Sequence, residues 1–394
     1  MKLNKTFLTL GLAAALLQMP ASSFAQNAGG SRQNPLLQKS SLPFGAPDFS
    51  KIQESDYLPA FEAAIKDQRA NIQKIVSNKK KPTFQNTILA YEESGNLLDR
   101  VSSVFFGLTS AHKTPVIAET EKKVMQHLTD LDNEISFNQQ LFERIKYVYD
   151  NEYKRLKGED QRLTEKIYKG FVRSGALLPT EKMERMKQIN SRISELQQQW
   201  GNLLPAATNN AVVWVDSKEE LAGLSEADIA QCKKDAEMRG NKKPYCIVIT
   251  NTPQQPIHAS LQNRELRKKV FMASIHRADG TNPEFNTFPI VTELAKLRAE
   301  KANIMGYRCY AEYSLENTMA KTPTNVDNFL KQLISEFTPK ADAETQAIEQ
   351  YARKTEGNDF KLQPYDRFYY SAKMKKKMLN ISDDEIKPYF ILAE

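Results

Sequence analysis

The histidines and the carboxylates near them are the first residues in this chain that could do chemistry. There are four histidines, and two of them begin an H-x-x-D pattern, His127 with Asp130 and His276 with Asp279. A spacing of three places each pair on one helix face, where both side chains could ligate a metal ion. Each pair supplies only two ligands, whereas a zinc site needs three or four. We therefore predict no metal site in this chain, and interpret each pair as a surface histidine beside a carboxylate.

The signatures of the common hydrolytic and nucleotide-binding sites are absent from the sequence. No histidine is followed by glutamate with a second histidine four residues on, so no H-E-x-x-H helix can form. That motif needs two imidazoles one turn apart to bind zinc and a carboxylate to activate water. The 394 residues also contain no G-x-S-x-G turn and no G-x-x-x-x-G-K phosphate loop. We assign no catalytic residue and no metal ligand.

Three tyrosines late in the chain are the remaining candidates for a site. They are Tyr365, Tyr369 and Tyr370. Aromatic side chains beside a channel can contact a peptide backbone or an apolar side chain. Clustered aromatic residues are more often part of a hydrophobic core. Both interpretations stay open, with core packing favoured, and these three tyrosines are the candidate substrate-channel residues.

The charge and cysteine content limit the classes of partner. The formal charge is +7, with two denser basic stretches at Lys79–Lys81 and Lys373–Lys377. Acidic residues are interleaved along most of the chain, so these stretches are predicted to be solvated helix faces rather than a nucleic-acid surface. The cysteines, Cys232, Cys246 and Cys309, form no C-x-x-C pair. One disulfide could form, but buried thiols are the simpler interpretation.

The first residues are typical of a secretory signal. Lys2 and Lys5 precede an apolar stretch from Phe7 to Met19, and small residues precede Gln26. The stretch is much shorter than the roughly 20 residues that cross a bilayer, so cleavage is preferred over a membrane anchor. We predict a signal peptide over residues 1–25 and an exported protein, periplasmic or secreted, with no membrane anchor after cleavage.

The rest of the chain is predicted to be mainly helical. Residues 26–50 are rich in Gly, Ser, Asn and Pro, which predicts an extended leader rather than a helix. Helical periodicity dominates residues 51–394, where glycine is scarce. The fold class is therefore mainly α, a multi-helix lobe with a small β-sheet insertion.

Two helices can be predicted in detail. One opens at Pro179 and should run about six turns, packed into an all-α core. Its apolar stripe recurs at steps of three and four: Met183, Met186, Ile189, Ile193, Leu196, Trp200 and Leu203. The other spans about 289–305, with Pro289 in the first turn and Gly306 just past the end. By spacing, Arg298, Glu300 and Lys301 should be mostly outward on this second helix.

The β-sheet insertion is predicted from two segments rich in β-branched and aromatic residues. They are Ala211–Val215 and Tyr245–Thr250. The segment between them, Glu219–Arg239, is predicted to be helical, with Ser225 as an N-cap for its second part. A small sheet inside an α-rich protein follows from this arrangement.

A series of short patterns runs along most of the chain. They include Asn34-Pro35-Leu36-Leu37, Tyr57-Leu58-Pro59-Ala60-Phe61, Tyr168-Lys169-Gly170-Phe171, Asn263-Arg264-Glu265-Leu266-Arg267, Leu297-Arg298-Ala299-Glu300-Lys301-Ala302 and Leu362-Gln363-Pro364-Tyr365-Asp366. In this order they resemble the N-terminal half of the thimet oligopeptidase family of zinc metallopeptidases, and within it the bacterial peptidyl-dipeptidases (dipeptidyl carboxypeptidases). The shared order makes the resemblance specific.

The resemblance implies a helical fold of two lobes around a deep channel. It implies that the zinc ligands and the catalytic glutamate lie beyond Glu394, so no residue here inherits those roles and this chain binds no zinc itself. We expect the N-terminal part of an enzyme that releases dipeptides from the C-terminus of short peptides, inactive alone. The apolar final segment, Tyr389-Phe390-Ile391-Leu392, suggests a chain cut within a domain. The alternatives are a non-catalytic helical protein that binds peptides or a partner, and one half of a split peptidase assembled with a separate zinc-bearing half.

Overall fold

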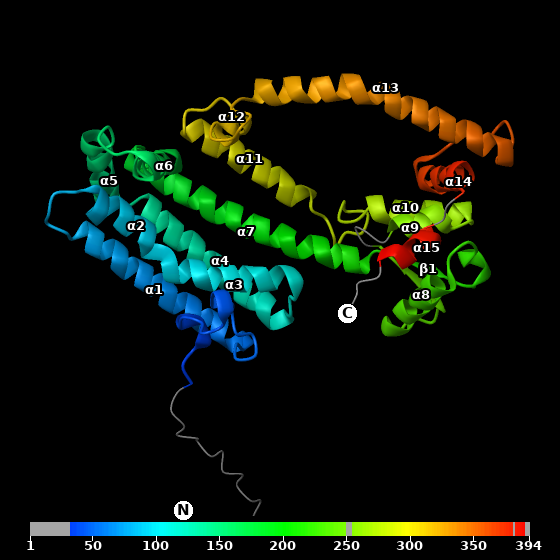
Figure 1. Ribbon diagram of the computed structural model, residues 1–394, viewed down its shortest axis with the longest axis horizontal. Coiled ribbons are helices and arrows are strands. Elements are labelled where there is room, and N and C mark those ends of the chain that lie inside the picture. Colours follow the sequence, from blue (N-terminus) through cyan, green and yellow to red (C-terminus); the bar gives the residue numbers. More distant parts are fainter. Residues whose placement is uncertain (1–31, 250–253, 381–382, 391–394) are drawn as a thin grey trace, which may run out of the picture.

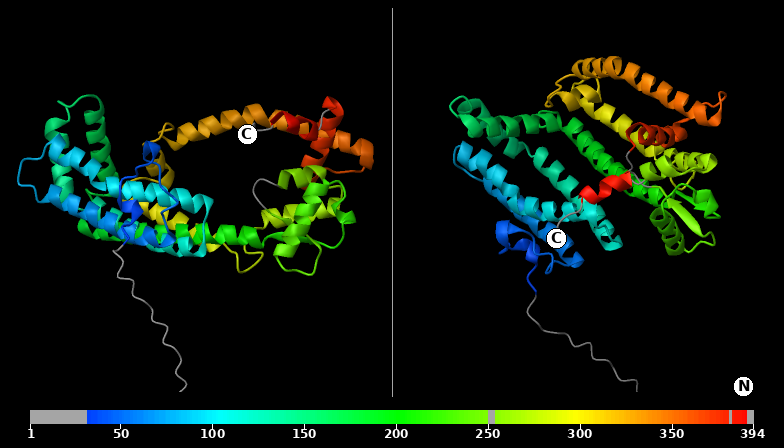
Figure 2. Two further views of the ribbon diagram at one scale, coloured as in Figure 1. Left: turned by 60° about the horizontal axis from the view of Figure 1, so that its bottom comes forward. Right: turned by 45° about the vertical axis from the view of Figure 1, so that its right-hand side comes forward.

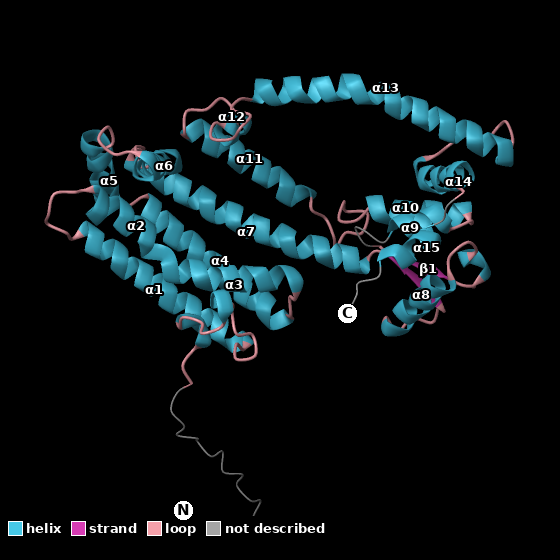
Figure 3. Ribbon diagram, in the orientation of Figure 1, coloured by secondary structure: helices cyan, strands magenta, loops and turns pink. Residues whose placement is uncertain are grey.

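The computed structural model describes residues 32–249, 254–380 and 383–390 of the chain. Helices make up most of this part, and a two-stranded sheet accompanies them (Figure 3), so the predicted mainly helical class is confirmed. The predicted signal peptide, residues 1–25, and the end of the apolar final segment, 391–394, lie outside the described residues. No helix in the described ranges is both long and apolar enough to cross a membrane.

The first part of the chain forms a layer in which α3, α1, α4 and α7 lie side by side in turn, and α11 (Phe288–Ile304) later adds to it beside α7 (Figure 1). Rings from α1 and α3 fill its core, where Phe61 and Phe105 meet edge to face at 5.3 Å. Both side chains are fully buried. The elements of this part are α1 (Tyr57–Val76), a π-helical segment (Phe84–Leu89), α2 (Ala90–Glu92), α3 (Asn96–Ala111), α4 (Pro115–Ser136), α5 (Gln139–Glu152), α6 (Gly158–Ser174) and α7 (Thr180–Asn210).

The described part of the leader, residues 32–50, lies on this layer. The prediction of an extended leader holds only in part. Prolines begin two 3-10 turns within it, Pro35–Leu37 and Pro43–Gly45. The fixed φ of proline suits the first position of such a turn. Leu36 is buried against the helices, and Arg32 pairs with Asp56 at 2.7 Å.

Helix α7 is longer than predicted. It has 31 residues, about eight or nine turns, and continues through Pro205. Met183, Met186, Ile189 and Leu196 are buried as predicted, but Trp200 is 40% exposed. The predicted stripe fails there because α7 and α4 do not close over one another at this level: Gln198, Gln199 and Asn202 line an open hollow with residues of α4.

The sheet insertion is confirmed. Strands β1 (Val212–Val215) and β2 (Tyr245–Val248) pair antiparallel, with Val213 opposite Ile247. Between them, α8 (Glu226–Met238) begins where Ser225 accepts a hydrogen bond from the Asp228 backbone N–H at 3.1 Å, as predicted. Helices α9 (Gln254–Ser260) and α10 (Arg264–Ile275) follow, and α10 lies against β1.

The chain then returns along α7 and crosses the molecule a second time (Figures 1 and 2). Helix α11 (Phe288–Ile304) packs on α7, and Gly306 follows it with φ +86°, as predicted for that position. The 34-residue helix α13 spans from α12 to α14, and the residues that it buries, Ile348 and Ala352, lie near its end. The last elements are α12 (Tyr310–Leu315), α13 (Pro323–Glu356), α14 (Arg367–Leu379) and α15 (Asp383–Ile386).

The orientation of Lys301 on α11 corrects a prediction. Its side chain does not point outward, because this face of the helix packs on α7. The Lys301 ammonium donates a hydrogen bond to Asn190 Oδ1 at 2.7 Å. Asn190 Nδ2 in turn donates to Asn133 Oδ1 on α4 at 2.9 Å. Burial lowers the pKa of Lys301.

A close backbone approach beside the sheet gives a testable prediction. Gly223 has φ +96°, and a Cβ there would lie 2.2 Å from the Ser260 carbonyl oxygen. Gly240 also has a positive φ, +65°, but a Cβ there would meet nothing within 4 Å. We expect Gly240→Ala to cost about 1–2 kcal/mol of unfolding free energy from backbone strain alone. Gly223→Ala should cost about 1–3 kcal/mol more, because the backbone at residue 260 must move.

Urea unfolding followed by tryptophan fluorescence measures both variants. Trp200 and Trp214 are the two tryptophans of the chain, and Trp214 lies in β1 itself. If both variants lose the same amount of unfolding free energy, the close approach to residue 260 does not affect stability.

Candidate functional site

A buried carboxylate joins α10 to the start of α14. Asp366 is 0% exposed and ends the 3-10 turn Pro364–Asp366. Arg267 Nη2 donates to its Oδ1 at 2.9 Å, and Arg264 Nη2 donates to its Oδ2 at 2.7 Å. The Gln363 backbone N–H adds a third donor at 3.1 Å. Charged donors therefore surround a carboxylate that is itself fully buried, and such charge-assisted hydrogen bonds are stronger than those between neutral groups.

Arg267 is as deeply buried as its partner. Its side chain is 1% exposed, and Nη1 donates to the Leu261 and Gln262 carbonyl oxygens at 2.8 and 3.0 Å. The guanidinium lies 4.1 Å from the centre of the Tyr369 ring, within range of a cation–π interaction. Its Nε has no hydrogen-bond partner among the described residues.

The protonation state of Asp366 follows from these contacts. Burial on its own would raise the pKa of the carboxyl group. The hydrogen bonds from Arg264 and Arg267 act in the opposite direction and outweigh it, so the pKa of Asp366 lies below its usual value. The group is therefore an ionised structural partner, which is unsuited to donating a proton at neutral pH.

The predicted tyrosines gather around this centre. Tyr369 and Tyr370 are buried and pack with Ile348 and Ala352, whereas Tyr365 is partly exposed. Burial is also the first cause that raises the pKa of Tyr370. Tyr369 and Tyr370 are packed as core residues. Of the three tyrosines, Tyr365 is the one that is partly exposed to solvent. A role of Tyr365, Tyr369 and Tyr370 in a substrate channel stays a prediction.

The sequence patterns do not predict the arginines of this centre. Arg264 and Arg267 precede Asp366 by 102 and 99 residues, so no local spacing connects them. A signal did exist, since the segments 263–267 and 362–366 both belong to the series of family-like patterns. One segment carries the cations and the other carries the acid that they bind.

A buried histidine lies beside the same centre. His258 is 5% exposed, and its Nδ1 has no hydrogen-bond partner among the described residues. Its ring lies 6.4 Å from that of Phe368 on α14. Burial, and then the charge of Arg267, lower the pKa of His258, which favours the neutral imidazole.

The two H-x-x-D patterns lie apart and at the surface. His276 Nδ1 contacts Asp279 Oδ2 at 2.7 Å, and that contact is the first cause that lowers the pKa of Asp279 to about 2. In the other pattern, Asp130 Oδ1 accepts a hydrogen bond from Gln126 at 2.9 Å, while His127 lines a separate surface hollow.

The described residues do not fit a zinc ion. Across the described ranges, no group of three or more His, Cys, Asp or Glu side chains is placed to hold a metal. The three cysteines are free thiols, with Cys232 and Cys246 buried and Cys309 partly exposed. Burial is the main cause that raises the pKa of Cys232 to about 11, so its thiol is a poor ligand and a poor nucleophile.

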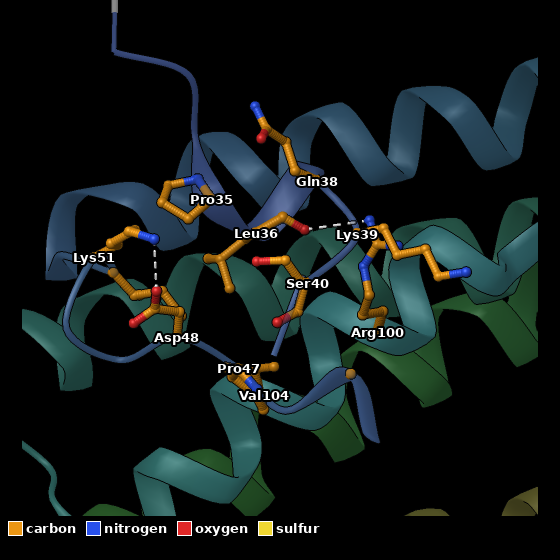
Figure 4. Close-up of a pocket in the computed structure, with 13 residues that line it drawn as sticks. Pro35, Leu36, Gln38, Lys39, Ser40, Pro47, Asp48, Lys51, Arg100 and Val104 are labelled. Atoms are coloured by element: carbon orange, nitrogen blue, oxygen red, sulfur yellow. Dashed lines mark hydrogen bonds and ion pairs between the residues drawn. The ribbon is translucent and has the colours of Figure 1, made fainter. Parts of the chain in front are cut away.

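A small cavity lies between the leader and α3 (Figure 4). It has a volume of about 140 Å³, and Leu36, Pro47 and Val104 contribute apolar lining. Arg100 Nη2 donates to the Leu36 carbonyl oxygen at 3.4 Å across one side of it. Lys51 is paired with Asp48 at 2.8 Å on the other side. The cavity could hold a small apolar group under a polar rim, but it offers no nucleophile with an adjacent base.

Comparisons with known proteins identify relatives of this sequence. The model of peptidase family M3 matches residues 257–394. The chain is 34% identical over 91% of its length to dipeptidyl carboxypeptidase of Escherichia coli (strain K12). It is 29% identical to oligopeptidase A of the same organism over 91% of the chain, and 24% identical to thimet-like oligopeptidase of Dictyostelium discoideum over 90%. The chain spans about half the length of these relatives, 53%, 52% and 52% respectively.

The buried charge pair gives the second prediction. Asp366→Asn leaves the buried Arg267 without a counter-charge, so we expect a loss of about 3–5 kcal/mol in unfolding free energy. The matched control is Asp216→Asn, which breaks the exposed ion pair with Lys243. That change should cost no more than about 1 kcal/mol. Chemical denaturation of both variants provides the comparison.

The pH dependence tests the same interaction independently. Because the folded pKa of Asp366 is lowered, its contribution is complete above the unfolded Asp pKa of about 3.9. It is lost as the pH falls from there through the lower folded value. The stability difference between wild type and Asp366→Asn should therefore shrink below about pH 4. A difference that stays constant from neutral pH into strong acid would contradict this account.

Proposed function

This chain belongs to peptidase family M3, and from that premise we propose that it is part of a zinc metallopeptidase of the dipeptidyl carboxypeptidase type. Such an enzyme would release dipeptides from the C-terminus of short peptides, which are the proposed ligands. The observation that carries the proposal is the 34% identity, over 91% of the chain, to dipeptidyl carboxypeptidase of Escherichia coli (strain K12). Because the chain spans 53% of that relative, the activity is proposed for the whole enzyme.

We propose that these residues contribute scaffold and channel wall rather than the metal centre. The sequence contains no H-E-x-x-H, and the described residues do not fit zinc. The helical layer and the Asp366 centre would instead fix the position of the surfaces that meet a peptide. Tyr365, which is partly exposed beside Arg264, is the side chain that we propose for such a contact.

The third prediction concerns the purified 394-residue chain. We expect it to retain no stoichiometric zinc after dialysis and to hydrolyse no fluorogenic short peptide, with or without added zinc. The physical reason is that two-ligand pairs bind zinc weakly and no water-activating group is assembled beside them. Metal analysis and the peptide assay should use the dipeptidyl carboxypeptidase of Escherichia coli as a positive control.

The contrary outcomes are specific. One tightly held zinc per chain that disappears on mutating His127 or His276 would contradict the assignment of these residues to scaffold. Turnover that persists after host peptidases are removed would do the same. Peptide binding without turnover would instead favour the non-catalytic binding alternative, and activity regained on adding a zinc-bearing second chain would favour a split peptidase.

We also propose that the protein is exported to the periplasm or secreted. The support is the sequence pattern of residues 1–25, a basic start followed by a short apolar stretch. The fourth prediction is that N-terminal sequencing of the protein recovered from outside the cytoplasm begins at Gln26. A chain lacking residues 2–25 should stay in the cytoplasm, and an uncleaved N-terminus on the full chain would contradict the proposal.

A further inference from the structure

A basic hollow on the helical layer has no part in the function proposed above. It has a volume of about 570 Å³ and lies between α6 and the segment 313–321, which leads from α12 into α13. We propose that it binds a compact polyanion whose charges are phosphate groups or clustered carboxylates. Five cations line it: Arg162, Lys166, Lys169, Arg173 and Lys321.

The cations on α6 form one stripe. Arg162, Lys166, Lys169 and Arg173 recur at steps of four, three and four, the spacing that places side chains on one helix face. Gly170 lies among them, and a Cβ there would meet nothing within 4 Å, so the floor of the hollow is open. Basic stripes are commonly solvated surface, but this one faces a second wall built from residues far along the chain.

The carboxylates near the hollow do not balance its cations. Glu165 is shared, because Arg162 and Lys169 donate to its two oxygens at 2.9 and 2.6 Å. Among the described residues, Lys166 and Lys321 have no hydrogen-bond or ion-pair partner. Like charges held together repel one another, and a bound polyanion would relieve that repulsion.

Residues of the opposite wall hold Arg173 of α6 in a fixed orientation. Arg173 pairs with Glu316 and donates to the Tyr313 carbonyl oxygen at 2.6 Å. Its guanidinium also lies 4.6 Å from the centre of the Tyr313 ring. A guanidinium held in this way is preorganised, and planar guanidinium groups are suited to phosphate and carboxylate.

Backbone strain marks the rim of the hollow. Lys321 has φ +65°, a left-handed conformation that costs a residue with a Cβ about 1–2 kcal/mol. Strained residues of this kind cluster at binding sites. Here the strain occurs at a lysine whose ammonium has no partner in the described part of the chain, at the edge of a hollow already lined by cations.

The test uses the 394-residue chain with inorganic triphosphate and with a tri-glutamate peptide as separate probes. Titration calorimetry at low ionic strength should detect one site for at least one probe. Lys166→Ala/Lys321→Ala should weaken that binding at least tenfold, as should Gly170→Gln, which fills the floor without changing charge. The matched control, Lys375→Ala/Lys376→Ala on α14, removes the same charge elsewhere and should leave affinity within about twofold.

Gly170→Gln also separates a built site from general attraction between charges. Replacing a helical glycine should raise the thermal unfolding temperature of the chain or leave it unchanged. A loss of binding could then not be ascribed to misfolding. Binding of triphosphate alone would identify phosphate groups as the ligand chemistry, and binding of tri-glutamate alone would identify carboxylates. Failure to bind either probe, or equal weakening by the α14 control, would overturn the proposal.

Discussion

The contact between Arg267 and Asp366 is the constraint on which the arrangement of the second part of the chain depends. After α10 the chain runs back along α7, turns through α12 and crosses the molecule again in α13 before it meets α10 once more. Closing a loop of 99 residues costs conformational entropy that grows only slowly with its length. A fully buried charge pair offsets that cost only in one geometry, because both charges lose their hydration unless they meet. The pair therefore specifies where α14 docks.

The aromatic residues around the pair depend on the same constraint. Tyr369 lies against the Arg267 guanidinium on one side, and its ring meets that of Tyr370 edge to face at 5.0 Å on the other. Tyr370 continues the cluster to Phe360 at 5.2 Å. The tyrosines are thus positioned by a cation that comes from another part of the chain. Any surface that Tyr365 presents to a ligand takes its place from that centre as well.

Local patterns predict several of the elements but not how they pack. The N-cap at Ser225, the two strands and the glycine after α11 depend on residues close in sequence, and each was predicted. Spacing within one helix predicts an outward Lys301, because it cannot reveal that α7 covers that face. The stripe also predicts a buried Trp200, because its spacing continues the pattern, but spacing cannot reveal that α4 and α7 leave an open hollow at this level. In the candidate site, the tyrosines could be named from their clustering, whereas their arginine partners required the fold.

A proline inside helix α13 determines where this helix bends most easily. It is 34 residues long, about 50 Å, and Pro339 lies at its middle. Proline has no N–H to donate, so one hydrogen bond of the helical ladder is absent at that point. The helix therefore behaves as two stiff rods of about 25 Å with a softer joint between them. Because α13 connects α12 to α14, a change in the angle between its two ends is accommodated most easily at Pro339.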